Sequence, residues 1–133
     1  MMFTIDKIKA EHRKVKSGTD FPKYIQAIKK MGVSRYTVNV ADGNTEYFDQ
    51  HGHSVSTGAE YDILTIAENP DPEHFKLRLQ LHQQGGTDYR SFCKDCARNG
   101  IKGWNVNLNT MTCTYLDKTG NDVLTEQIPD INH

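Results

Sequence analysis

The chain has 133 residues, 36% of them apolar and 25% charged, which excludes a disordered chain and allows a modest core. It has no run of about 18 apolar residues, and residues 1–6 lack a signal peptide's basic start and apolar core; we expect no membrane partner and a cytoplasmic location. The net charge of −1 divides into +6 up to Arg35 and −7 beyond it. Without an aromatic RNA-binding strand or zinc-finger spacing, this basic segment does not predict a nucleic-acid partner.

The elements predicted along the chain fall into two similar series, each beginning with a helix. Residues 5–15 and 72–82 carry apolar side chains at helical spacing. Each of these helices ends at a histidine, His12 or His82, and a shift of 70 positions aligns the two. Packing at a helix end, with a favourable dipole interaction, is the simpler explanation for both histidines.

A second helix follows in each series. It is predicted to start at Thr19-Asp20 or Thr87-Asp88, where the side-chain oxygen of either residue can cap the free N–H groups of the first helical turn. It ends at Gly32 or Gly100, because glycine readily adopts the left-handed conformation that terminates helices. Capping is the preferred role for these two aspartates, ahead of a catalytic one.

Three short strands complete each series, with apolar and polar side chains alternating as in a sheet with one buried face. Tyr36 and Trp104 belong to the apolar face of the first strand of each series. Asn39 and Asn107 belong to the polar face, where they either line a cleft or face water. One more strand is predicted between the two series, over residues 61–67.

The two series also share sequence. A shift of 68 positions gives ten identities over residues 17–55, a stretch in which chance gives about two or three. We therefore predict a single domain, residues 1–133, made by tandem duplication of a helix-helix-three-strand unit, with repeats at about residues 1–60 and 69–129. The predicted fold class is α+β, an antiparallel sheet with helices packed on it and a pseudo-twofold axis between the repeats. Whether the strands form one sheet, a sandwich or a half-barrel stays open.

The three cysteines are candidates for metal or thiol chemistry. Cys93 and Cys96 form a Cys-x-x-Cys pair within a predicted helix, whereas a thioredoxin-like pair begins its helix, where the dipole lowers the thiol pKa. The aligned positions hold Ile25 and Ile28, so packing in the core is the preferred explanation for the pair, and also for Cys113. A metal site with a histidine, or a thiol nucleophile, is the alternative. No cofactor is expected.

Residues at matching positions of the two series supply the candidate ligand site. Side chains related by a pseudo-twofold axis can meet in a pocket between the repeats. The candidates are His12, His82, Tyr36, Trp104, Asn39 and Asn107.

Short motifs are spread over nearly the whole chain. They are Val15-Lys16-Ser17-Gly18, His82-Gln83-Gln84-Gly85, Thr87-Asp88-Tyr89, Phe92-Cys93, Gly100-Ile101 with Trp104, Met111-Thr112-Cys113-Thr114-Tyr115, Asp117, Gly120, Glu126 and Ile128-Pro129. In these motifs the chain resembles the YbcV-like family of small bacterial proteins of unknown function. Some members are prophage-encoded and labelled phage envelope proteins. The resemblance implies a stand-alone cytoplasmic bacterial protein, and it carries over no activity, cofactor or catalytic residue.

Three functional hypotheses follow, in order of preference. The first is a non-enzymatic binding module that holds a small molecule or peptide between its repeats. The second is a protein-interaction or assembly factor, a homodimer that docks through its basic N-terminal helices. The third is an enzyme in which Cys93 or Cys113 acts with His82 as base.

Overall fold

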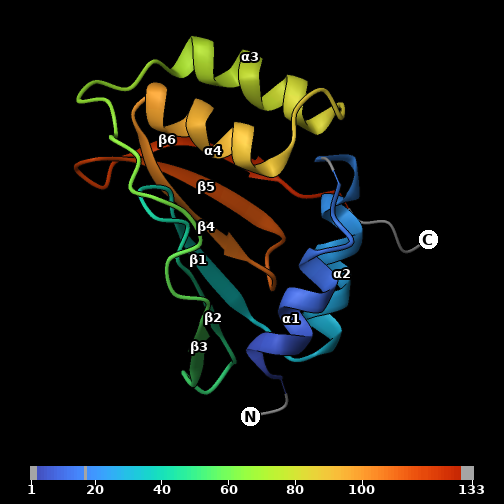
Figure 1. Cartoon of the computed structure of the whole chain (residues 1–133). Coiled ribbons are helices and arrows are strands. Elements are labelled where there is room, and N and C mark those ends of the chain that lie inside the picture. Colours follow the sequence, from blue (N-terminus) through green and yellow to red (C-terminus); the bar gives the residue numbers. More distant parts are fainter. Residues whose placement is uncertain (1–2, 17, 130–133) are drawn as a thin grey trace.

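The structure, a computed structural model, describes residues 3–16 and 18–129; Ser17, where the aligned stretch of the repeats begins, lies outside them. The described residues form four α-helices and one six-stranded antiparallel sheet, which confirms the predicted α+β class (Figure 1). The first half of the chain forms α1 (Ile5–His12), the 3₁₀ turn η1 (Gly18–Asp20), α2 (Phe21–Lys30), β1 (Arg35–Asn39), β2 (Thr45–Phe48) and β3 (Ser54–Ser56). The second half forms α3 (Pro72–Gln83), α4 (Tyr89–Arg98), β4 (Ile101–Asn107), β5 (Thr112–Asp117) and β6 (Asp122–Gln127).

The two halves join at the centre of one continuous sheet, with the strand order β3-β2-β1-β4-β5-β6. In the central antiparallel pair, Tyr36 lies opposite Val106 and Val38 lies opposite Trp104. The 68-residue shift aligns Tyr36 with Trp104 and Val38 with Val106. A twofold rotation between β1 and β4 therefore exchanges these two pairs and preserves the register. The order of helices and strands is the same in both halves. Their common origin by duplication stays a prediction.

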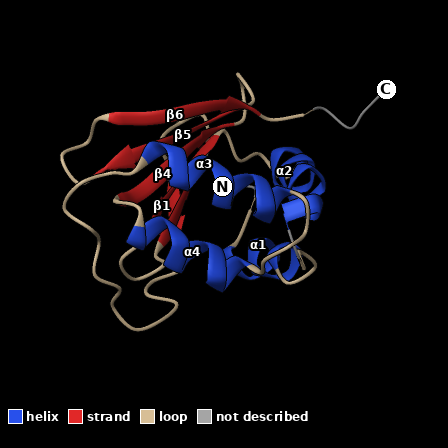
Figure 2. Cartoon of the chain, turned by 90° about the horizontal axis from the view of Figure 1, so that it is seen from above, coloured by secondary structure: helices blue, strands red, loops and turns tan. Residues whose placement is uncertain are grey.

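Both helix pairs lie on the same side of the sheet (Figure 2). The strand residues that face the helices are buried, whereas residues such as Asn39, Asn105 and Asn107 on the other face are exposed. The core therefore lies between the sheet and the helices. Its fully buried side chains include Ile8, Ile25, Ile28, Phe75, Ile101 and Leu108.

A bulge in β4 sets the direction of the tryptophan. The pairing with β5 is irregular between Ile101 and Gly103, and both Gly103 and Trp104 are buried. A bulge breaks the strict alternation of a strand and re-aims the following side chains. Gly103 also allows β1 to come close, because a Cβ at this position would collide with the carbonyl oxygen of Val38. Trp104 thus faces the helices.

The two aspartates predicted to cap helices, Asp20 and Asp88, behave differently. Asp88 caps α4 as predicted, with its Oδ1 accepting a hydrogen bond from the Ser91 N–H at 2.8 Å. The same prediction for Asp20 is wrong, because its carboxylate accepts from the backbone N–H of Lys16 at 2.9 Å and makes no cap bond to α2. Two local features explain this: Asp20, the last residue of η1, already has helical dihedral angles, and Pro22 has no N–H to donate in the first turn of α2.

The strand predicted over residues 61–67 is also wrong, since this segment belongs to a loop between β3 and α3. Its apolar residues do not keep one buried face: Ile63 is 75% exposed. Isolated backbone bonds fix the loop in place, from the Leu64 N–H to the Ala41 carbonyl at 2.7 Å and from the Ala67 N–H to the Ala97 carbonyl at 2.9 Å. The loop therefore runs beside the sheet instead of extending it.

Candidate functional site

A cavity of about 430 Å³ lies between the sheet and the two helix pairs. All four helices contribute to its lining, together with five strands and the loop after β3. The residues that line its floor come from β1, β2, β4 and β5, the strands on either side of the junction between the halves. The cavity is thus a property of both halves together.

Four aromatic side chains at aligned positions form much of this floor. Tyr36 and Trp104 come from the central strands, and Tyr47 and Tyr115 come from the strands beside them. The ring centroids of Tyr36 and Tyr47 are 5.1 Å apart, and those of Trp104 and Tyr115 are 5.9 Å apart, typical spacings for packed aromatic rings. Burial raises the pKa of Tyr47 to about 12 and that of Tyr36 well above its usual value. The floor is therefore uncharged at neutral pH.

Two polar atoms of the floor have no protein partner. The Tyr47 hydroxyl is 2.6 Å from the Tyr24 hydroxyl, but across residues 3–16 and 18–129 neither the Tyr36 hydroxyl nor the Trp104 indole N–H makes a hydrogen bond. Tyr36 is 3% exposed and Trp104 is 5% exposed. Every fully enclosed side-chain nitrogen or oxygen in the same residues is partnered, so these two atoms must reach the cavity. They offer two hydrogen-bond donors to a molecule inside it.

His12 lies where the two helix pairs meet. Its ring packs edge-on against Tyr24 of α2 at 5.3 Å and against Tyr89 of α4 at 4.9 Å. Burial lowers the pKa of His12, and the opposing effect of the nearby Glu60 carboxylate is smaller. A neutral imidazole therefore forms part of the wall at neutral pH.

His82 is held at the other helix pair. Its ring stacks on Phe92 at 4.4 Å, and its Nδ1 lies 3.1 Å from the carbonyl oxygen of Thr87 and 3.0 Å from the hydroxyl of the same residue. Because a carbonyl only accepts, Nδ1 carries the proton and Nε2 is the acceptor. Burial lowers the pKa of His82, against a smaller effect of the Thr87 bond.

Of the six candidate ligand-binding residues, the structure brings four to this cavity: His12, His82, Tyr36 and Trp104. Asn39 and Asn107 do not join them, which corrects the expectation that all six converge. Both asparagines are exposed on the face of the sheet that bears no helices. The period of two along a strand sends them away from Tyr36 and Trp104.

The cysteines are buried, and burial raises the pKa of each thiol, to about 12 for Cys113. A thiol nucleophile needs the opposite, a lowered pKa and an accessible sulfur. Within the described chain no hydrogen bond joins His82 to a cysteine, and no group of three or more His, Cys, Asp or Glu side chains is placed to hold a metal ion. Cys93 and Cys96 pack in the core beside the sheet.

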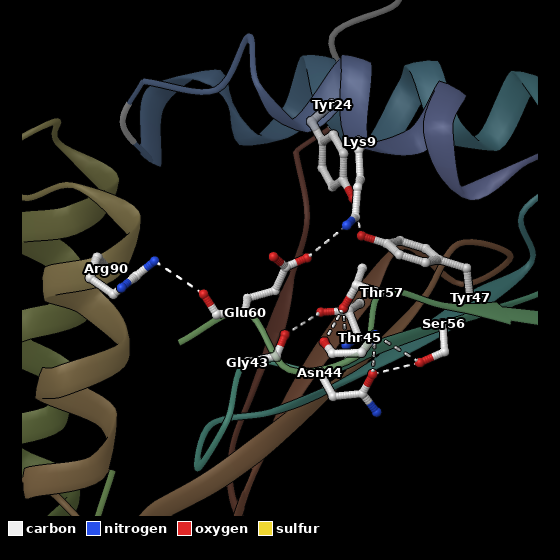
Figure 3. Close-up of polar contacts among 11 residues, drawn as sticks. Lys9, Tyr24, Gly43, Asn44, Thr45, Tyr47, Ser56, Thr57, Glu60 and Arg90 are labelled. Atoms are coloured by element: carbon white, nitrogen blue, oxygen red, sulfur yellow. Dashed lines mark hydrogen bonds and ion pairs between the residues drawn. The ribbon is translucent and has the colours of Figure 1, made fainter. Parts of the chain in front are cut away.

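The mouth of the cavity carries charged side chains that sequence reasoning missed (Figure 3). Lys9 of α1 lies 3.4 Å from the carboxylate of Glu60, and Arg90 of α4 donates to the Glu60 carbonyl at 3.4 Å. The Arg90 guanidinium also lies 4.8 Å above the Tyr61 ring. Glu60 and Tyr61 belong to the irregular loop, which has no periodicity from which a position could be predicted.

The chain matches the family model described as "Protein of unknown function (DUF1398)" over residues 9–127. No curated protein matches it at a significant level. Among the helices of the described residues, none combines the length and apolar character needed to cross a membrane. Since the match covers most of the chain, the protein belongs to the DUF1398 family, whose function is unknown.

Proposed function

We propose that this protein is a non-enzymatic binding module that holds one small molecule in the cavity between its two halves. The observation that carries the proposal is a pair of hydrogen-bond donors, the Tyr36 hydroxyl and the Trp104 indole N–H, which reach the cavity and have no partner among the described residues. A bound molecule with an acceptor group can take a hydrogen bond from either donor. The cavity's volume and mostly aromatic floor suit a small organic molecule.

The wider setting rests on the family resemblance. We propose a cytoplasmic protein of bacterial, often prophage-associated, genomes whose single domain arose by duplication of one unit. A homodimer docking through the basic helices, and an enzyme using a buried thiol, rank below the binding module. The cavity gives binding a specific location, whereas the raised thiol pKa values argue against a nucleophile.

A fluorescence titration tests the proposal with N-phenyl-1-naphthylamine, an uncharged apolar dye. Trp104 is the chain's one tryptophan, so energy transfer from it to the dye reports binding beside the cavity floor. We expect one saturable site per chain. Absence of saturable transfer would contradict the proposal.

Three variants of β1 locate the site. Val38 lines the cavity, whereas Thr37 belongs to the opposite face of β1. Val38→Phe should fill space needed by the dye and weaken binding about tenfold, a loss of about 1.4 kcal/mol. Thr37→Phe is the matched control and should bind as wild type. Val38→Met adds less volume and should give an intermediate effect, and equal affinity in all three variants would exclude the cavity as the site.

A further inference from the structure

We propose that the natural ligand is an amphipathic organic acid, with a flat neutral body in the aromatic cavity and its acidic group at the end bordered by Lys9, Arg13 and Arg90. This inference rests on the proposed function and specifies its ligand class. The chemistry is that of a carboxylate or similar oxyacid attached to an aromatic or other apolar body.

The inner part of the cavity selects the neutral body. Its floor consists of Tyr36, Tyr47, Trp104 and Tyr115, with no cation among them. An anion placed there would lose its hydration without gaining a positive partner, which is strongly unfavourable. The Trp104 N–H instead suits a neutral acceptor such as a carbonyl or ether oxygen. The charged end of a bound molecule must therefore lie elsewhere.

The charges that line the cavity are unevenly distributed. They are three cations, Lys9, Arg13 and Arg90, and two anions, Glu60 and Glu126. Glu126 already accepts a hydrogen bond from the Gln83 side chain at 2.8 Å, and Glu60 is paired with Lys9. No ion pair to Arg13 or Arg90 occurs within the described part of the chain. Neither arginine is therefore neutralised by a carboxylate there, and Arg90, which donates one bond to the Glu60 carbonyl, has further N–H donors for an acidic ligand.

The aligned positions of α1 and α3 show at which end the acid binds. The 70-residue shift that aligns His12 with His82 also aligns Lys9 with Leu79 and Arg13 with Gln83. All of these side chains line the cavity. The α1 side of the cavity thus carries positive charge where the α3 side is apolar or neutral, so the acidic group is directed toward α1.

The Glu60 carboxylate lies beside Lys9, where the acidic group of the ligand is proposed to bind. It meets Lys9 at 3.4 Å, at the mouth between α1 and α4 (Figure 3). The Glu60 and Lys9 side chains are 41% and 38% exposed, and ion pairs this exposed contribute little to stability. A ligand acid can exchange with the Glu60 carboxylate at little cost. Removing the Glu60 charge should therefore strengthen binding of an acid, whereas removing a rim cation should weaken it.

The experiment compares two dyes with the same body, 1-anilinonaphthalene-8-sulfonate and the uncharged N-phenyl-1-naphthylamine. The sulfonate should bind more tightly than the neutral dye to the wild-type protein. The dissociation constant of the neutral dye divided by that of the sulfonate measures the contribution of the acid. Arg13→Gln with Arg90→Gln should lower that ratio roughly fivefold, because two exposed charge contacts of modest strength are lost. Glu60→Gln should raise it about two- to threefold.

Arg35→Gln is the matched control, because Arg35 is exposed, lies 3.7 Å above the Phe48 ring and does not line the cavity. Arg35→Gln should leave the ratio of dissociation constants unchanged. The dissociation constant of the neutral dye should be the same in every variant. If the neutral dye binds as tightly as the sulfonate, or Arg35→Gln lowers the ratio as much as the rim variants, the acid inference is overturned while the binding module stands. If neither dye receives energy from Trp104, both proposals fail.

Discussion

The two halves of the molecule build the same arrangement of helices and strands but fill it differently. In the second half, Phe75 of α3 is fully buried and packs on Phe92 and Tyr115, with ring centroids 6.2 and 5.0 Å away. In the first half the aligned position of α1 holds the smaller and only partly buried Ile5. One aromatic ring therefore completes the core beneath α3, whereas the aligned position of α1 contributes a smaller and only partly buried side chain.

A second aligned pair, one residue from each half, differs in polarity. Phe92 of α4 corresponds to Tyr24 of α2, whose hydroxyl is bonded to that of Tyr47. The first half thus combines a hydroxyl pair with Lys9 and Arg13 of α1, where the second half has Phe92 and, at the aligned positions of α3, Leu79 and Gln83. The comparison teaches that two similar frames can form one cavity with a polar end and an apolar end.

The largest expected effect tests the difference in packing between Phe75 of α3 and Ile5 of α1. Phe75→Ala should lower the free energy of unfolding by about 3–5 kcal/mol, because it leaves a cavity in a closely packed core. Ile5→Ala is the aligned control and should cost less, about 1–2 kcal/mol, since its side chain is only partly buried. Urea unfolding of both variants measures the difference. Equal losses would mean that the two halves are packed alike.

A smaller effect is expected from the hydroxyl pair. Tyr24→Phe leaves the Tyr47 hydroxyl buried without its partner and should cost about 1–3 kcal/mol, and Tyr47→Phe should cost a similar amount. The double variant removes both polar groups and should cost less than the sum of the two. Urea unfolding of all three variants completes the cycle. Strict additivity would show that the two hydroxyls are not coupled.

The pH dependence of stability tests the neutral histidines. Burial lowers the pKa values of His12 and His82 below the unfolded value of 6.5, so between those values the unfolded state binds more protons. Stability should be level above pH 6.5 and fall as the pH drops through the folded pKa values. Unfolding of wild type at pH 7.5 and 5.5 measures this loss, and His82→Gln should reduce it.

Between pH 7.5 and 5.5 the change in stability should come from the histidines and not from the carboxylates. The carboxylates with lowered pKa values, Asp49, Glu68, Asp88 and Asp117, contribute stability that is present above their unfolded pKa values of 3.8 to 4.5. That stability is lost only at more acidic pH. A wild-type protein equally stable at pH 7.5 and 5.5 would contradict the buried, neutral histidines.

The smallest effect on stability should come from the rim. Lys9→Met removes an ion pair between side chains that are both about two-fifths exposed, so the free energy of unfolding should change by about 0–1 kcal/mol. Glu60→Gln should give a similarly small change. A loss several times larger in either variant, measured by urea unfolding, would mean that this contact holds the loop in place and cannot easily exchange with a ligand.

Local features of the sequence predicted most of the fold. Helical spacing, the Asp88 cap and the alternation around Tyr36 depend on neighbouring residues, and these predictions are confirmed. The failure at Asp20 came from a short 3₁₀ turn, which changes the backbone where the cap was expected. The segment over residues 61–67 failed because its course is set by separate bonds to distant parts of the chain.

The candidate site was predictable only in part. Tyr36 and Trp104 were found because aligned aromatic residues on a buried strand face mark positions where the halves meet. Asn39 was included as one of a matched pair on the polar strand face that either lines a cleft or faces water, and its place one residue from Val38 assigns it to the outer face. Glu60 and Arg90 could not be found, since their approach depends on how a loop and a helix meet in space.

The most direct test of the ligand cavity is an NMR titration of the Trp104 indole N–H with N-phenyl-1-naphthylamine. With one tryptophan in the chain, this group gives a single indole resonance. The account predicts that it shifts to saturation at one dye per chain, while the backbone resonance of Asn105, an exposed neighbour on the opposite face, moves less. A saturating dye that leaves the Trp104 resonance in place would contradict it.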